Sequence, residues 1–326
     1  METPLAPPAG ELPAPPCGRD RSRGADEPAE QERACAAAPV LSVHGTIVRV
    51  RIATIGDVML DVIVRLEGPL AAGGDVRART RAGAGGQAAN VAAWAAALGA
   101  EARCIAKRGA DASGELVGHE LAGHGVELVG PVAPGRTGVV VSIVATDGER
   151  SLASDRGVAA ELAPDEVEEA WLECDVLHVS GYALLREPVA AAALLAARLA
   201  RGRGARVSLD AAAWMEIRAV GPVRFRELLD ALAPDVLFAT EAEWEMLGGA
   251  YLTAPVGVIK RGPRGCTVVG DEARLDLAAV EAEVVDTTGA GDALAAGFLL
   301  GGSLEQAARR GLQAAARCVA TLGALP

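Results

Sequence analysis

The sequence DTTGAGD at residues 286–292 leads directly into the apolar stretch ALAAGFLL at residues 293–300. Small residues at a helix start let backbone N–H groups converge on an anion, and the helix dipole adds about half a positive charge there. Asp292 enters the first helical turn, so its carboxylate is predicted to lie beside this turn, where it could accept the proton of an attacking hydroxyl. The alternative is a glycine turn with a capping aspartate, which is common in α/β proteins.

Outward from this motif, the chain from Ile47 alternates short apolar runs with amphipathic segments. Strands are predicted at 48–55, 102–106, 176–179, 206–209, 236–239, 256–260 and 266–269. Helices are predicted at 87–98, 114–122, 165–172, 188–201, 223–232, 241–247 and 293–300. Apolar strands separated by helices indicate an α/β fold of three layers, with a mostly parallel central sheet covered on both faces.

Two segments, about 62–82 and 135–156, break this rhythm. Both alternate apolar and polar residues around turn signals, Gly73-Gly74 in the first and Asp147-Gly148 in the second. This alternation predicts a small antiparallel β sheet set apart from the main sheet, which could serve as a lid over a site. The alternative is that these segments are edge strands of the main sheet.

A second glycine motif, GAGGQAAN at residues 83–90, precedes the helix predicted at 87–98. The glycine pair lets the backbone approach a ligand, and the amide of Asn90, one turn into the helix, both donates and accepts hydrogen bonds, which suits a polyol. The motif is not a dinucleotide fingerprint, because Ala88 stands where the last glycine would be needed. A glycine hinge between lid and core is the structural alternative.

Composition excludes several classes of function. The formal net charge of −12 argues against a nucleic-acid partner. No run of about 18 uninterrupted apolar residues indicates a membrane span. The six cysteines form no C-x-x-C pair, which favours reduced thiols in a cytoplasmic protein. Residues 1–46 are rich in Pro, Ala and charged residues and are predicted to be a disordered tail, or else to result from a mis-assigned start of the chain. One folded domain is predicted at 47–326.

Together the two motifs resemble the signatures of the ribokinase-like (PfkB) carbohydrate kinase family, and the resemblance spans Val48 to Pro326. The second signature matches residues 286–292 at every defined position. The first signature, two glycines, an alanine, an asparagine and a helix that ends in Leu-Gly, matches Gly85, Gly86, Ala89, Asn90, Leu98 and Gly99. The resemblance implies a three-layer α/β/α fold with a β lid, and ATP-dependent phosphorylation of a hydroxyl with Mg²⁺.

The resemblance also implies roles for individual residues. The catalytic set is Asp292 as the base, with Gly289, Ala290 and Gly291 as the anion-binding turn. The substrate set is Asp61, Gly85, Gly86, Asn90 and Arg156. The nucleotide set is Thr240, Lys260, Gly262, Gly265 and Thr287. Glu243 would organise Mg²⁺ through water, and Asp286 and Thr288, near the segment 322–324, lie where many members bind a monovalent cation such as K⁺.

Several positions depart from the family pattern. Thr240 stands where an asparagine is usual, which leaves the Mg²⁺ arrangement open, and Met59 replaces the asparagine of ribose-specific members. Arg156 falls where ketose and keto-acid kinases place an arginine that faces the substrate. The expected acceptor is a small sugar or sugar acid: a ketose, a ketodeoxy sugar acid or a ribose-like sugar.

Two alternatives remain open. A nucleoside kinase would favour aromatic stacking surface, but the lid segments contain no Phe, Tyr or Trp. A non-catalytic binding or regulatory relative would be expected to lose the base or the glycines, which this chain keeps. A homodimer formed through the lid strands is also left open.

Overall fold

The computed structural model describes residues 41–43, 46–147, 149–249, 254–270 and 274–326. The predicted tail, 1–46, therefore lies largely outside the described residues, and the prediction of disorder stays a prediction. Two short strands at its end, β1 (Leu41–Val43) and β2 (Thr46–Val48), pair with each other in antiparallel fashion.

The main sheet has, among the described residues, nine strands in the order β17-β16-β15-β14-β13-β12-β3-β6-β8. All pairings from β15 through to β8 are parallel, and only β16 runs antiparallel to its two neighbours. The strands are β3 (Arg51–Ile55), β6 (Glu101–Ile105), β8 (Val126–Val129), β12 (Val176–Ser180), β13 (Arg206–Asp210), β14 (Val236–Thr240), β15 (Val256–Lys260), β16 (Cys266–Val269) and β17 (Arg274–Leu277). The mostly parallel central sheet is confirmed.

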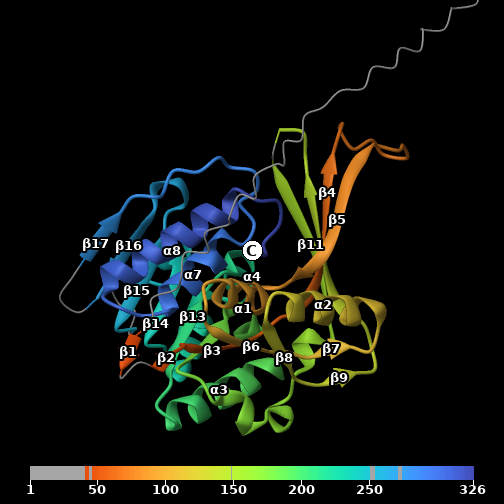
Figure 1. The fold of residues 1–326 in the computed structure, drawn as a ribbon. Helices are drawn as coiled ribbons and strands as arrows, with labels where there is room; N and C mark the ends of the chain where they lie inside the picture. Colours follow the sequence, from red (N-terminus) through yellow and green to blue (C-terminus); the bar gives the residue numbers. More distant parts are fainter. Residues whose placement is uncertain (1–40, 44–45, 148, 250–253, 271–273) are drawn as a thin grey trace, which may run out of the picture. The chain divides into compact units, whose positions relative to one another are not determined.

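Helices cover both faces of this sheet (Figure 1). One face packs against α1 (Gln87–Ala97), α2 (Ala112–Gly123), α7 (Ala290–Leu299) and α8 (Leu304–Val319). The other packs against α3 (Val189–Gly202), α4 (Trp214–Val220), α5 (Pro222–Leu232) and α6 (Glu241–Met246). Neighbouring residues of one strand, such as Ile52 and Ala53, belong to opposite cores because successive side chains point to opposite faces. No described helix combines the length and the apolar character needed to cross a bilayer.

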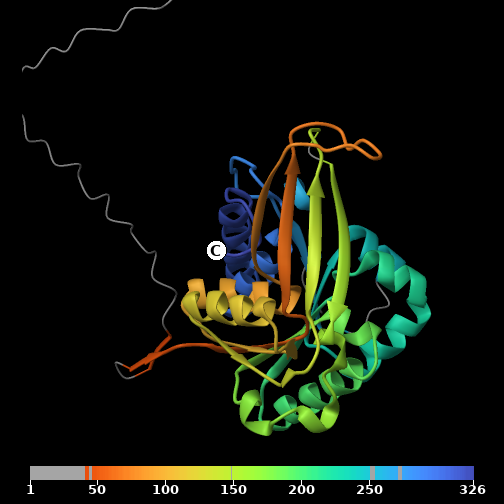
Figure 2. The same cartoon turned by 90° about the vertical axis from the view of Figure 1, so that its right-hand side faces the viewer.

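The lid sheet is formed by β4 (Met59–Leu66), β5 (Ala78–Gly85), β10 (Thr137–Val144) and β11 (Arg150–Gly157), in the order β11-β10-β4-β5. Figure 2 shows these strands, in orange and yellow-green, side by side as a separate sheet. Both predicted hairpins are antiparallel, and a parallel pairing of β4 with β10 joins them. The chain crosses between the lid and the layered domain four times, each time next to a glycine with a positive φ: Gly56, Gly86, Gly135 and Gly157.

The helix predicted at 165–172 is wrong. Two short 3₁₀ turns, Pro164–Glu166 and Glu169–Leu172, stand there instead, with extended backbone at Val167 and Glu168 between them. The Glu166 carboxylate accepts hydrogen bonds from the backbone N–H of Ala163 at 2.8 Å and from the ammonium of Lys107 at 2.7 Å. These contacts hold the first turn, and the extended backbone at Val167 and Glu168 ends it before an α-helix can form.

The fold places a crevice at the ends of two central strands. From β3 the chain builds the sheet in one direction through β6 and β8, and from β12 it builds in the other direction through β13, β14 and β15. In open α/β sheets, ligands bind outside the carboxyl ends of the strands at the point where the order reverses. The carboxyl ends of β3 and β12 therefore mark the expected position of a site.

Candidate active site

Three neighbouring strands, β13, β14 and β15, end in Asp210, Thr240 and Lys260. Because these strands are parallel, the three residues meet at the same edge of the sheet. The Lys260 ammonium donates to both carboxylate oxygens of Asp210 at 2.7 Å. Burial raises the pKa of Asp210 to about 6, although the neighbouring ammonium opposes this rise. The result is a largely buried ion pair at the edge where a ligand would bind.

Thr240 and Glu243 form a capping box at the start of α6. The backbone N–H of Thr240 donates to Glu243 Oε2 at 2.8 Å, and the backbone N–H of Glu243 donates to Thr240 Oγ1 at 3.3 Å. Glu243 is only 3% exposed. Threonine at position 240 thus caps the helix as an asparagine would. Its backbone N–H also holds the Glu243 carboxylate, for which the family resemblance predicts a role with Mg²⁺.

The glycine turn before α7 has the open backbone that the sequence predicts. Gly289, at φ 77°, precedes the first helical residue, Ala290. A Cβ added at Gly291 would lie 3.2 Å from the Lys260 ammonium nitrogen, and one added at Gly289 would lie 2.7 Å from the Cβ of Ala324. Glycine at 289 therefore lets Ala324 pack against the turn, and glycine at 291 lets the Lys260 ammonium lie close to the helix start. A cation beside a helix start is a combination that favours anion binding.

Asp292 lies in the first turn of α7 and is partly buried. Its Oδ2 accepts a hydrogen bond from Nδ2 of Asn90 at 2.8 Å. Burial raises the pKa of Asp292 to about 7, which the Asn90 hydrogen bond opposes and the nearby carboxylates of Asp210 and Asp61 support. A carboxylate with this pKa can take up and release a proton near neutral pH.

The GGQAAN motif supplies two buried polar groups. Gln87 and Asn90 are 7% and 5% exposed, and the Gln87 Oε1 accepts a hydrogen bond from Ser180 Oγ at 2.5 Å. Gln87 Nε2 and Asn90 Oδ1 have no hydrogen-bond partner among the described residues. An unused donor and an unused acceptor on one helical turn suit a hydroxyl-bearing ligand, because a hydroxyl both donates and accepts.

Asp61 reaches this site from the lid strand β4. A Cβ at Gly85 would fall 2.1 Å from the Asp61 Cγ, so only glycine allows the carboxylate to lie against β5. Burial raises the pKa of Asp61 to about 6, and the guanidinium of Arg150 opposes this rise. Gly86, at φ 97°, then turns the chain from the lid into α1.

Arg156, at the foot of β11, is committed to other protein groups. Its Nη1 contacts Asp57 Oδ2, its Nη2 lies 3.0 Å from Glu216 Oε1, and its guanidinium stacks 4.3 Å from the ring centroid of Tyr182. The side chain is 12% exposed. Its contact with a substrate stays a prediction, and its guanidinium already forms ion pairs with the carboxylates of Asp57 and Glu216.

The predicted nucleotide set also includes Gly262, Gly265 and Thr287. Gly265, at φ 87°, is needed between β15 and β16, because a Cβ there would fall 2.0 Å from the Leu277 carbonyl oxygen. Gly262, at φ 57°, has open space around its Cα. Thr287 is exposed, and its carbonyl accepts from the Ala290 N–H at 3.4 Å.

Asp286 is saturated by protein donors. Its Oδ1 accepts from the backbone N–H of Thr288 at 2.9 Å and from its hydroxyl at 2.6 Å, and its Oδ2 accepts from the Gly323 N–H at 3.0 Å. Burial would raise the pKa of Asp286, but these donors together lower it. The Arg150 Nη1 lies 3.6 Å from Oδ1 and already supplies a positive charge. In this arrangement protein donors and a guanidinium occupy the carboxylate oxygens that a monovalent cation would need.

The structure thus brings Asp61, Asn90, Lys260 and Asp292 together around the turn at 289–291, and it leaves Arg156 in a separate ion-pair cluster. Three neighbours of the site, Gln87, Asp210 and Arg150, were not predicted as site residues. Asp210 carries a sequence signal, since it directly follows a buried strand. Arg150 carries none, since arginine is by far the commoner basic residue of this chain. Within the described ranges, no three His, Cys, Asp or Glu side chains are gathered so as to hold a metal ion.

Comparisons with known proteins assign the chain to a family. The chain is 34% identical over 281 residues to the ATP-dependent ribose-1-phosphate kinase of Halopiger xanaduensis, which covers 82% of this chain and 90% of that protein. Adenosine kinase from Sinorhizobium meliloti superposes with a TM-score of 0.75 at 26% identity, covering 86% of this chain and 96% of the other. Ribokinase from Arabidopsis thaliana, solved with ribose and ATP, shares the fold with a TM-score of 0.70 at 24% identity over 86% of this chain and 96% of the other. The pfkB family carbohydrate kinase model matches residues 50–326. The chain therefore belongs to the PfkB family of carbohydrate kinases.

Proposed function

We propose that the protein transfers the γ-phosphoryl group of ATP to a hydroxyl of a small sugar-like molecule, with Asp292 as the base. The observation that carries this proposal is the position of the Asp292 carboxylate: it follows the open turn at 289–291, beside the Lys260 ammonium, and is held by Asn90. A proton acceptor next to an anion-binding turn is the arrangement that phosphoryl transfer to an alcohol requires.

In the proposed reaction, Asp61 and the free groups of Gln87 and Asn90 hold the acceptor. Asp292 removes the proton of the attacking hydroxyl, and the alcohol oxygen forms a bond to the γ-phosphorus while the bond to the ADP oxygen breaks. Backbone N–H groups of the turn and the Lys260 ammonium stabilise the negative charge on the transferred group. The proton ends on Asp292 and leaves to solvent with the product.

The residues present also fit Mg²⁺ and ATP. The donor at position 243 is a buried carboxylate oxygen, and Mg²⁺ is bound in kinases through one or two carboxylates together with phosphates and water. Glu243 would hold the ion through water, and the ion would offset phosphate charge. The space that a side chain would fill at Gly291 leaves room for a phosphate oxygen near Lys260.

The acceptor remains a small sugar or sugar acid, of ketose, ketodeoxy sugar acid or ribose-like type. The ion pairs of Arg156 favour a neutral group at the foot of the lid over a carboxylate. The named relatives act on a ribose phosphate and on adenosine, so a nucleoside kinase is the second candidate. It is disfavoured because neither lid hairpin offers an aromatic ring for a base to stack on.

We also propose a cytoplasmic homodimer formed through the lid. The face of the lid sheet opposite Asp61 carries half-buried apolar side chains, among them Val62, Val64, Val141 and Ile143. Cys104, Cys174, Cys266 and Cys318 are free thiols, as a reducing compartment would keep them. Light scattering of wild type and of Val141→Lys tests the dimer: loss of the dimer is expected in the variant, and a monomeric wild type contradicts the proposal.

The decisive experiment is a coupled assay of ADP release over ribose, fructose, ketodeoxygluconate, phosphosugars and nucleosides. Asp292→Asn should lower kcat by at least about 100-fold on the best acceptor, the usual scale for loss of a general base, and should leave ATP affinity nearly unchanged. A variant that keeps more than about a tenth of wild-type turnover would rule out Asp292 as the base.

A further inference from the structure

The lid sheet has an inner face, defined here as the face that carries Asp61. Successive strand residues alternate between faces, and cross-strand partners share a face. Ile63 and Arg65 of β4 therefore lie on the inner face with Asp61. Arg81 is the cross-strand partner of Ile63 and shares its face. Arg65 pairs with Val144, and Val144 pairs with Arg150, so Arg150 also lies on this face. Arg65, Arg81 and Arg150, from three strands, thus stand on the inner face beyond Asp61, and Arg79, the partner of Arg65, shares this face.

These arginines reach toward the segments that flank the anion-binding turn. Arg81 Nη1 donates to the carbonyl of Leu322, and Arg65 Nη2 donates to the carbonyl of Val285 at 3.4 Å. Arg150 Nη1 donates to the Thr288 hydroxyl. A guanidinium has five N–H donors in a fixed fork, so most of the donors of all three remain free for a ligand.

The charge on this face is incompletely matched. In the part of the chain that the structure describes, neither Arg65 nor Arg81 is within ion-pair distance of a carboxylate. Among the described residues, the only carboxylate within ion-pair distance of Arg150 is that of Asp286, which three other donors already bind. By contrast, Lys260 at the base of the site has a carboxylate partner, Asp210. The unmatched positive charge of the site therefore lies under the outer part of the lid.

The distance from Asp61 to these arginines is short enough for one small molecule to contact both. Strands rise about 3.3 Å per residue, so the row of Arg81 stands about 7 Å beyond Asp61 and the row of Arg65 and Arg150 about 13 Å beyond it. Arginine side chains can bridge several ångströms of either gap. A pentose whose hydroxyls are held by Asp61 can thus extend a substituent among the three guanidinium groups.

We propose that the acceptor carries a phosphate group, and that Arg65, Arg81 and Arg150 bind it while another hydroxyl faces Asp292. This inference rests on the proposed function and names the substrate class of the same site. A phosphate is favoured over a carboxylate because its three terminal oxygens and up to two negative charges can engage guanidinium groups from three directions. A carboxylate has two oxygens in one plane, and a single guanidinium can bind both of them.

The test compares ribose with ribose 1-phosphate and ribose 5-phosphate, with ketodeoxygluconate as the carboxylate probe. A sugar phosphate should have a kcat/KM at least about tenfold above ribose and ketodeoxygluconate, the scale of one charge-assisted contact. Arg81→Met and Arg150→Met should each lower the ratio of kcat/KM for the phosphorylated to the unphosphorylated sugar by about tenfold or more.

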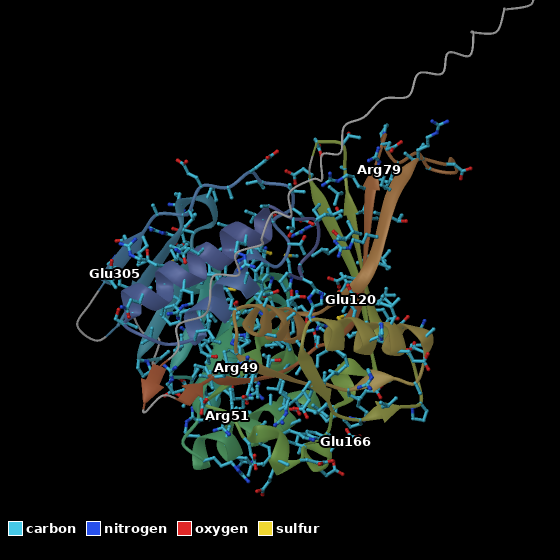
Figure 3. The ribbon with its side chains drawn as sticks, in the orientation of Figure 1. Arg49, Arg51, Arg79, Glu120, Glu166 and Glu305 are labelled. Atoms are coloured by element: carbon cyan, nitrogen blue, oxygen red, sulfur yellow. The ribbon has the colours of Figure 1, made fainter. Side chains whose placement is uncertain are left out.

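Arg79→Met is the matched control. Arg79 stands on the same face and in the row of Arg65, at the outer end of the lid (Figure 3), but it is 85% exposed and pairs with Glu67 at 3.3 Å. Its ratio should stay within twofold of wild type. Binding without ATP gives a second readout: the sugar phosphate should raise the melting temperature of wild type and of Arg79→Met, and should fail to do so in Arg81→Met.

The outcomes separate the inference from the proposed function. ADP release with ribose but no gain from phosphate, and an unchanged ratio in the arginine variants, would overturn the inference and leave the kinase assignment intact. A preference for ketodeoxygluconate would overturn it in favour of a carboxylate, and a rise in the KM for ATP alone in Arg150→Met would place this arginine in the nucleotide site. No ADP release with any acceptor would overturn the proposed function itself.

Discussion

Replacing Asn90 by leucine tests the link between the first glycine motif and the base. Asn90 Nδ2 donates to Asp292 Oδ2 at 2.8 Å and so favours the ionised carboxylate. Burial has already raised the pKa of Asp292 to about 7. As a base, Asp292 is active when ionised, so activity should be present above about pH 7 and should be lost as the pH falls through this value. Asn90→Leu removes the donor, disfavours the ionised form and moves this window upward.

The magnitude follows from the hydrogen bond. A bond to a charged group contributes about 1.5–3 kcal/mol, and one pKa unit corresponds to about 1.4 kcal/mol. Water can replace part of the lost bond beside the partly buried Asp292, so the midpoint should rise by about one pH unit. Activity at pH 7 should then drop from about half of its plateau to about a tenth of the variant's own plateau.

The assay is kcat/KM for the acceptor between pH 5.5 and 9.5 at saturating ATP, because this parameter reports the pKa values of the acceptor-free enzyme. Gln87→Leu is the matched control: it removes a buried amide from the same helical turn, but that amide is bound to Ser180. The control should change the height of the profile and not its midpoint. If Asn90→Leu lowers activity equally at every pH, Asn90 does not set the ionisation of Asp292 and this reasoning fails.

Three further predictions follow. Gly291→Ala places a methyl 3.2 Å from the Lys260 ammonium and should lower kcat by about 100-fold, as loss of an oxyanion donor does, with little change in melting temperature; near-normal turnover would exclude a tight fit of phosphate there. Arg156→Ala leaves Asp57 and Glu216 without their shared cation and should cost about 3 kcal/mol in the free energy of unfolding, measured with urea; a loss under about 1 kcal/mol would mean that the pairs are not structural. A chain that starts at Ile47 should keep the melting temperature and activity of the full chain, and a clear drop would show that the tail packs on the domain.

Much of the layered fold could be predicted because its signals are local. The buried strands, most helices and both glycine motifs are read from runs of apolar residues and from glycine spacing. Helix α8 was not predicted although the sequence signals it: its buried residues Ala307, Ala308, Gly311, Leu312 and Cys318 recur at helical spacing, and Ser303 and Gln306 form a capping box at its start. Strands β8 and β17 have four residues each and gain their identity from pairing with β6 and β16.

The site was predictable only where a motif fixes it. Asp292 and Asn90 belong to signatures, but their hydrogen bond joins residues 202 positions apart, and no local pattern announces it. The same holds for Arg156, which the structure commits to Asp57 and Glu216, and for Arg150, whose position follows from strand register. The parallel pairing of β4 with β10 decides this register, and parallel pairing between distant strands has no short-range signal.

The four glycine crossings between the lid and the layered domain have a consequence for how acceptor preference can change. The continuous β4–β10 register, from Gly138–Met59 to Val144–Arg65, makes the two hairpins one mechanical piece attached at Gly56, Gly86, Gly135 and Gly157. Asp61 and the inner-face arginines belong to that piece, whereas the proton acceptor and the ammonium belong to the strand and helix ends below it. The residues proposed to recognise the sugar thus belong to the lid, and the residues proposed to carry out phosphoryl transfer belong to the layered domain. Exchange of 59–85 and 137–157 with the corresponding hairpins of a relative should transplant the choice of sugar and leave the phosphoryl-transfer apparatus in place.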